Sequence, residues 1–262
     1  MSKEHVIPTW IVNALKLNNN YIGYQQQKAW YTFNNQTIKT VCQDCNNWIL
    51  SQLDEYMKKF LLQNFNDKLL LKWKKIQLIY NYHKLSRWLS KIICNSNEIN
   101  NYSFELKWNF IKKNKDYILW KERNNRNSLY IEVIRDPYLL EIDWYYNYSK
   151  QSIKDYKEYS RIIKISNLLT WDNWSLIFLW KMITIWEFIF YLFDKNKYNK
   201  KYIESNLANM NIIAKELSPN KNEVELIIWN NTIIDLFSKT YEWENGLNFW
   251  KYYQDYKNKN QN

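Results

Sequence analysis

The sequence predicts an α+β fold in which helices are followed by a mixed or antiparallel sheet. Residues 47–65 and 71–93 carry apolar side chains at helical spacing, and the second segment has Lys and Arg on its other side. From about residue 102 the pattern changes to short runs that are typical of strands. Hydrophobic residues make up 46% of the 262 residues, so the chain can bury a core without help from disulfides.

The order of the elements follows from these patterns. Residues 2–10 are expected to be extended, and weak strand character follows at 28–33 and 37–41. The first helix should begin at Asn47, and the acidic pair Asp54-Glu55 within it should form a solvated face. The later runs that predict strands are 102–111, 117–120, 128–135, 160–169 and 176–193.

The most apolar of these runs, residues 176–193, is barely long enough to cross a membrane as a helix and contains Lys181 and Glu187. We therefore expect buried core strands or a buried helix here, and no membrane span. A membrane-associated or structural protein built on this aromatic segment is the alternative.

The charge of the chain favours an anionic partner. Its net charge is +11, and residues 61–91 alone hold seven Lys or Arg against one Asp. Such an excess is typical of proteins that bind nucleic acid, although a Lys-rich composition can also serve only solubility. The three cysteines and the polar N-terminus predict a cytoplasmic, reducing location, with Cys as metal ligand or core residue.

A carboxylate and an imidazole lie side by side at the start of the chain, as Glu4-His5. A carboxylate can bind a divalent cation, and an imidazole can accept a proton from water near neutral pH. These are the two functions that a metal-dependent hydrolase needs. The simpler interpretation is an exposed N-terminus with an idle histidine.

A second short segment contains Cys42, Cys45, Asn46 and Asn47. The Cys spacing provides half of a tetrahedral zinc site, and buried thiols or an exposed dithiol are the alternatives. One Asn can cap the helix predicted to start here, and the other can offer its amide oxygen to a hard cation.

Together the two segments resemble the HNH endonuclease family, in the branch whose pattern reads EHxxPxWL…VCxxCNNGWxxxLE. The resemblance covers about residues 2–55, one fifth of the chain, and a looser similarity continues at "SRWLSKII". The matching residues are Glu4, His5, Pro8, Trp10, Ile11, Val41, Cys42, Cys45, Asn46, Asn47 and Leu53.

The resemblance implies an N-terminal ββα-metal module at residues 1–60, followed by a basic helical segment and an α+β domain of unknown role at 61–262. It implies a metal-dependent DNA endonuclease of the kind found in phages and mobile elements. His5 would be the general base, with Asn47 beside it as a ligand or orienting group. Glu4, Asn46 and Asn47 would be candidate ligands of Mg²⁺ or Mn²⁺.

The same resemblance implies a structural Zn²⁺ at Cys42 and Cys45, with an incomplete ligand set. DNA would be the partner, bound through its backbone by basic side chains, and a homodimer is left open. The residues expected to contact the DNA backbone are Lys72, Lys74, Lys75, Lys84, Arg87 and Lys91.

The sequence departs from the family pattern in three ways, and the first two support an alternative, a nucleic-acid-binding protein with a degenerate and inactive HNH motif. The Cys-x-x-Cys pair that the family usually has upstream of Glu-His is missing from this sequence. Trp48 stands where the family has Gly. The middle Asn of the pattern is unassigned, with Asn34 and Asn35 as candidates.

Glycine and tryptophan occur in unusual numbers. The chain has two Gly and fifteen Trp, and several Trp stand where a turn is expected. One hypothesis is a gene in which UGA encodes glycine but has been translated as tryptophan. The alternative is an authentic Trp-rich protein.

Overall fold

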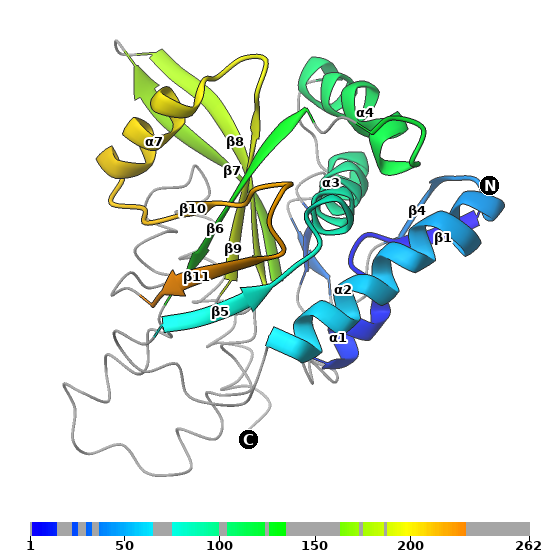
Figure 1. The fold of residues 1–262 in the computed structure, drawn as a ribbon. Helices are drawn as coiled ribbons and strands as arrows, with labels where there is room; N and C mark the ends of the chain where they lie inside the picture. The colour runs from blue at the N-terminus through cyan, green and yellow to red at the C-terminus, as the bar shows by residue number, and fades with distance from the viewer. Residues whose placement is uncertain are drawn as a thin grey trace, which may run out of the picture.

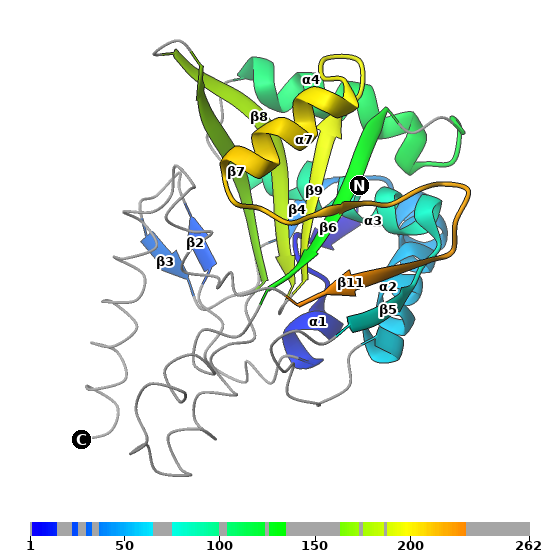
Figure 2. The same cartoon turned by 60° about the vertical axis from the view of Figure 1, so that its left-hand side comes forward.

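A computed structural model describes residues 2–14, 23–25, 30–32, 37–64, 75–99, 104–123, 126–134, 163–172, 175–185 and 188–228. These residues have the α+β fold class that the sequence predicts. Figures 1 and 2 show the arrangement, with one large sheet between a single helix on one face and several helices on the other.

The large sheet is antiparallel and has the strand order β10-β6-β9-β8-β7. Its central strands are in simple register, with Tyr130 opposite Tyr191 and Ile183 opposite Phe190. The strands of this sheet are β6 (Asn127–Val133), β7 (Ile163–Asp172), β8 (Ser175–Ile185), β9 (Phe188–Asp194) and β10 (Lys215–Glu216).

Both faces of this sheet are buried. Alternate side chains of a strand point to opposite sides, so one strand can contribute to the cores on both faces. From β9, Phe188, Phe190 and Leu192 join the large core that contains helix α3 (Tyr82–Ile99). Ile189, Tyr191 and Phe193 face helix α7 (Lys200–Asn209) instead. A strand buried on both faces reads as an unbroken apolar run.

This double burial explains why residues 176–193 look like a membrane segment in the sequence. They form most of β8 and β9, so the prediction of core strands is confirmed for the residues described there. No helix within the described ranges is long and apolar enough to cross a membrane.

The N-terminal part of the chain contains a separate two-stranded sheet and a long helix. β1 (Ser2–His5) pairs antiparallel with β4 (Thr37–Val41), and His5 lies opposite Thr37. A π-helical stretch, η2 (Cys45–Leu50), follows β4 and runs directly into α2 (Ser51–Asn64), whose buried stripe packs against α3. The remaining N-terminal elements are α1 (Thr9–Ala14), β2 (Gly23–Gln25) and β3 (Trp30–Thr32).

The predicted helix at 71–93 is wrong in its first part. Lys75–Ile79 form strand β5, which pairs with β11 (Glu223–Ile227), and α3 begins only at Tyr82. Asn81 separates the two elements, because its side-chain oxygen accepts a hydrogen bond from the Lys84 amide (3.0 Å) and so caps the helix.

The predicted strands at 102–111 and 117–120 are also wrong, since residues 104–118 form helix α4 (Phe104–Ile118). Asn114, Tyr117 and Ile118 are buried on one side of this helix, and Lys112, Lys113 and Lys115 are exposed. Short apolar runs fit either element, and contact with α3 selects the helix here.

One hydrophobic core extends across the boundary predicted near residue 60. It includes Val6 and Ile7 before the boundary and Phe188 and Ile228 far after it. The rings of Phe60 on α2 and Phe190 on β9 lie 6.4 Å apart between centroids. The division into 1–60 and 61–262 therefore stays a prediction.

Candidate functional site

Glu4 is buried on the inner side of β1 and forms an ion pair with Lys91 of α3. Its carboxylate oxygen Oε1 lies 2.8 Å from the Lys91 ammonium, and the side chain of Lys91 is only 1% exposed. Burial of a charge is costly unless an opposite charge or a hydrogen bond compensates it. Glu4 therefore provides part of what a buried lysine requires.

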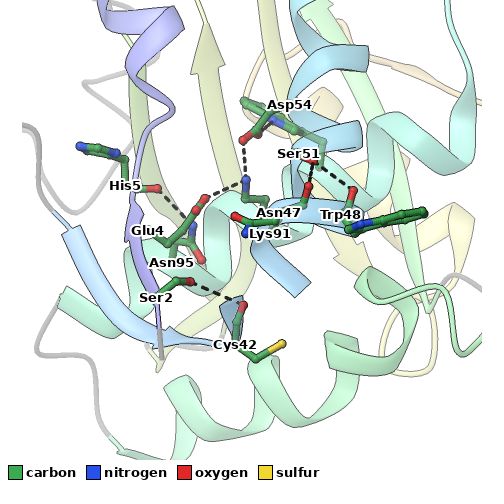
Figure 3. A network of polar contacts seen from close by, with 11 residues as sticks. Ser2, Glu4, His5, Cys42, Asn47, Trp48, Ser51, Asp54, Lys91 and Asn95 are labelled. Atoms are coloured by element: carbon green, nitrogen blue, oxygen red, sulfur yellow. Dashed lines mark hydrogen bonds and ion pairs between the residues drawn. The ribbon is translucent and has the colours of Figure 1, made fainter. Parts of the chain in front are cut away.

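Asp54 of α2 provides the second carboxylate at Lys91, with its Oδ2 at 2.7 Å from the ammonium. Its other oxygen, Oδ1, accepts a hydrogen bond of 2.8 Å from the indole N–H of Trp88. Trp88 and Lys91 lie three residues apart on α3 and so share one helix face. Figure 3 shows this network joining β1, α2 and α3.

The backbone of His5 is bound by a side chain of α3, and the His5 ring points away from Glu4. The Asn95 side-chain amide, on the same face of α3 as Lys91, donates to the His5 carbonyl oxygen at 3.4 Å. Successive residues of a strand point to opposite faces, and in Figure 3 the His5 ring points away from Glu4. The structure thus brings Glu4 together with Lys91 and Asp54, and it places the His5 ring on the other side of β1.

Asn46 and Asn47 lie near the start of the helical segment, which begins a few residues before the predicted start at Asn47. The Asn46 amide donates to the Cys42 carbonyl oxygen at 3.0 Å, and the Asn47 carbonyl oxygen accepts from the Ser51 hydroxyl at 2.7 Å. The Asn47 side chain is exposed, as is the neighbouring Trp48, with 73% of its surface accessible. In Figure 3 Asn47 and His5 lie on opposite sides of the Glu4–Lys91 pair.

Cys42 and Cys45 form a disulfide with each other, and the structural zinc at this pair stays a prediction. Their Cα atoms are 5.2 Å apart, a separation that suits a disulfide. The Cys45 amide also donates to the Cys42 sulfur at 3.0 Å. Among the residues with described positions, no three His, Cys, Asp or Glu side chains gather as a metal site.

The other Cys and His do not complete a ligand set. Burial raises the pKa of the Cys94 thiol to about 12, so it stays protonated. His83 lies with its Nδ1 at 3.5 Å from the Tyr117 hydroxyl, and burial first, then Arg87 and Lys195, lower its pKa. His83 therefore lies at the contact between α3 and α4 and is not brought to Cys42 or Cys45.

Two of the side chains predicted to contact DNA are internal, which corrects that part of the prediction. Lys91 is engaged by two carboxylates, and Arg87 is only 2% exposed. The Arg87 guanidinium donates to the carbonyl oxygens of Tyr117 (2.7 Å) and Glu122 (3.1 Å). Both cations are used inside the fold because their helix, α3, is packed between α2 and α4.

Lys75 and Lys84 are exposed, as a DNA-contacting residue must be. Lys75 forms an exposed ion pair with Glu225 (3.0 Å), and the Lys84 ammonium lies 5.9 Å from the centre of the Tyr56 ring. Lys72 and Lys74 lie outside the described residues, as do Asn34 and Asn35.

Asp54, Trp88 and Asn95 were missed as site residues by sequence reasoning. The prediction of a solvated acidic face holds for Glu55, which pairs with Lys59 at the surface, but is wrong for Asp54. The three-residue spacing of Trp88 and Lys91 was the available signal, because it puts an indole N–H and an ammonium on one helix face.

Comparisons with known protein families, with curated proteins and with solved structures found no match to this chain.

Proposed function

We propose that this protein is a DNA endonuclease of the HNH type. The observation that carries the proposal is the order and pairing of β1, β4 and the η2–α2 helical segment. His5 ends β1 opposite the first residue of β4, and Asn46 and Asn47 lie near the start of the helical segment that follows. This is the order in which the resembling family presents its base and its helix-borne Asn.

In this proposal His5 accepts the proton of the water that attacks a phosphodiester. The new P–O bond replaces the bond to the leaving sugar oxygen, which takes a proton from solvent. Its ring is partly exposed and points away from the buried Glu4–Lys91 pair, so water can reach it. General-base catalysis by a positioned histidine contributes about 10²–10⁴-fold to rate. Exposed lysines such as Lys84 would contact the phosphates, which adds affinity without sequence preference.

The described side chains do not fit a ready divalent-cation site. Glu4, the predicted Mg²⁺ or Mn²⁺ ligand, is paired with Lys91, and Asn47 lies apart from His5. We therefore assign no catalytic step to a cation. The assay below still includes both metals and a chelator.

Plasmid cleavage tests the proposal directly. Purified full-length protein is incubated with supercoiled plasmid in Mg²⁺, in Mn²⁺ and in EDTA, beside His5→Ala and His83→Ala. Because His83 is the only other histidine and packs at a helix contact, it is the matched control. We expect His5→Ala to lose at least about 100-fold in rate and His83→Ala to retain cleavage. Equal cleavage by His5→Ala and wild type, or no cleavage by wild type, would overturn the proposal.

A second candidate is a DNA-binding protein that does not cut, and the Glu4–Lys91 ion pair favours it. An ammonium within 2.8 Å of the carboxylate competes with any cation for that ligand. Fluorescence anisotropy with labelled duplex DNA at several salt concentrations tests it. Binding that weakens steeply with salt, without cleavage in any metal, would support this candidate. Absence of binding at low salt would exclude it.

A further inference from the structure

We propose that Lys91 and Asp54 are positioning residues for His5. This inference rests on the proposed function only in the use that it gives to His5. Its physical content is that a buried charge network on α2 and α3 sets the direction of a side chain on β1.

The polar network around Lys91 joins three elements, β1, α2 and α3. The Lys91 ammonium, 1% exposed, lies between the carboxylates of Glu4 (2.8 Å) and Asp54 (2.7 Å). The second oxygen of Asp54 is held by the Trp88 indole N–H at 2.8 Å, and Trp88 is fully buried. Charge-assisted hydrogen bonds of this kind are short and strongly directional. The position of the Glu4 carboxylate is therefore determined from α2 and α3.

Two residues of α3 connect Glu4 and His5 of β1 to the same helix face. Lys91 and Asn95 lie four residues apart on one face of α3, so both can reach the same strand. Lys91 holds the side chain of Glu4, and Asn95 donates to the carbonyl oxygen of His5. Because neighbouring side chains of a strand alternate, a strand held with Glu4 inward presents His5 outward. Loss of the ammonium or of Asp54 should free β1 to rotate and its His5 ring to change direction.

The experiment uses the fact that the chain has two histidines. Carbon-13 labelling of histidine gives two imidazole signals, and His83→Ala assigns them. Spectra and pH titrations are recorded for wild type, Lys91→Met, Lys91→Arg and Asp54→Asn. Lys59→Met is the control, because Lys59 pairs with Glu55 at the exposed surface of α2.

We expect the His5 signal to shift or broaden in Lys91→Met and Asp54→Asn while the His83 signal is unchanged. Lys91→Arg, which keeps a cation between the two carboxylates, should restore part of the wild-type signal. Cleavage by Asp54→Asn should lose at least tenfold in kcat with KM unchanged. If Lys91→Met fails to fold, Asp54→Asn and Lys91→Arg carry the test.

A wild-type His5 signal in folded Asp54→Asn would overturn the inference, as would equal changes at His5 and His83. The spectra are read without any cleavage. If the wild type does not cut DNA but its His5 signal depends on Lys91, the nuclease proposal is overturned and this inference is supported.

A second inference rests on backbone geometry at Trp120, on the spacing of paired strand ends at Trp174 and Trp186, and on exposure and the HNH resemblance at Trp48. We infer that Trp48, Trp120, Trp174 and Trp186 stand at glycine positions of the natural protein. Trp120, the second residue after α4, has a φ of 61°, in the left-handed region that disfavours residues with a side chain. The Trp120 amide donates to the Tyr117 carbonyl oxygen (3.2 Å) and the Lys121 amide to that of Asp116 (2.8 Å). This pair of bonds defines the helix-ending motif whose left-handed residue is usually glycine.

Two hairpins lead to the same conclusion. Asp172 of β7 pairs with Ser175 of β8, and Ile185 of β8 pairs with Phe188 of β9. Two residues therefore separate the paired ends in each case, and such connections favour Asn-Gly, or Gly followed by another residue. The sequence has Asn173-Trp174 and Trp186-Glu187 between these paired ends, and these four residues lie outside the described ones. Reading Trp174 and Trp186 as Gly gives both preferred pairs.

Trp88 shows what an authentic tryptophan looks like in this fold. It is fully buried, and its N–H is used by Asp54. Trp48, by contrast, is 73% exposed at the position where the HNH pattern has Gly. Trp120 is 44% exposed, although its ring lies 3.8 Å from the Arg87 guanidinium carbon, a contact that glycine would lose.

The test is to sequence the gene and to analyse the protein isolated from its natural source. We expect TGA codons at positions 48, 120, 174 and 186, a TGG codon at 88, and glycine at the four positions in peptide mass spectra of the native protein. TGG at these four positions, or tryptophan in the native peptides, would overturn the inference. In recombinant protein, Trp174→Gly should leave the melting temperature unchanged or raise it, whereas Trp88→Gly should lower it strongly.

Discussion

At Lys91 a single ammonium group lies between two carboxylates in the interior of the molecule. Removal of one partner from a buried ion pair leaves a charge without compensation, which costs far more than the loss of a surface pair. The two kinds of lysine occur together in this chain, since Lys59 forms an exposed pair with Glu55. The comparison of Lys91 with Lys59 therefore isolates the effect of burial.

We expect Lys91→Met to lower the free energy of unfolding by about 3–5 kcal/mol, because the buried Glu4 and the partly buried Asp54 remain without their cation. Lys59→Met should change it by no more than about 0.5 kcal/mol. Urea unfolding followed by circular dichroism measures both values. Similar small effects of the two substitutions would contradict the buried network.

The Cys94 thiol gives a second prediction for a single residue. Burial raises its pKa from 9.0 to about 12, so the unfolded chain loses this proton at lower pH than the folded protein does. The stabilisation is thus complete below about pH 9 and decreases as the pH rises toward 12. Burial also raises the pKa of Tyr56 to about 12, which acts in the same direction above its ordinary value of 10.0.

A thiol reagent that absorbs light on reaction checks this. Native protein at pH 8 should react only slowly at the partly buried Cys94, and protein unfolded in urea should show one rapidly reacting thiol, because Cys42 and Cys45 form a disulfide. Three thiols after unfolding would show that the pair is reduced. Rapid reaction of Cys94 in the native protein would contradict its burial.

At the scale of elements, the start of α3 decides where the Lys91 face points. Asn81 lies between β5 and α3 and caps the helix, because its side-chain oxygen accepts a hydrogen bond from the Lys84 amide. The backbone amide of Asn81 donates to the Tyr56 hydroxyl oxygen. A strand and a helix thus meet within three residues. A shift of this boundary would rotate Trp88, Lys91 and Asn95 away from β1.

We expect Asn81→Ala to lower the free energy of unfolding by about 1 kcal/mol, since it removes the cap. Asn81→Ser, which keeps an acceptor at this position, should restore most of that loss. The measurement is chemical unfolding of the three proteins under the same conditions. Equal stability of Asn81→Ala and wild type would show that the cap does not hold the helix start.

At the scale of the whole molecule, one hydrophobic core connects the N-terminal elements with the large sheet. Ile7 and Ile11 belong to the same buried cluster as Leu129 and Phe188. Elements that share a core usually unfold together. The predicted division at residue 60 would instead allow two separate transitions.

We expect a single urea transition that coincides when it is followed by circular dichroism and by tryptophan fluorescence. Phe60→Ala should lower the midpoint of the whole transition, because Phe60 contacts Phe190 across the predicted boundary. Two transitions, of which only the first moves in Phe60→Ala, would support the predicted modules at 1–60 and 61–262.

Strong local patterns were predictable from the sequence. The helix after Asn46, the strands at 128–135, 160–169 and 176–193 and the α+β class follow from periodicity and apolar content, which depend on neighbouring residues only. The secondary structure of residues 75–79 and 104–118 was predicted wrongly, because short apolar runs fit either a helix or a strand. Pairing with β11 makes residues 75–79 a strand, and packing on α3 makes residues 104–118 a helix.

The sequence by itself determined which residues are close to one another along the chain, and so it identified Glu4-His5, Cys42-x-x-Cys45 and Asn46-Asn47 as one group. Only the tertiary structure decided how these residues are used. It turned Glu4 inward to Lys91 and Asp54, turned His5 outward, and took Arg87 and Lys91 out of the basic surface. The physical reason is that burial and ion pairing are set by contacts between β1, α2 and α3, which lie far apart in sequence, and no local pattern records the partner of a buried charge.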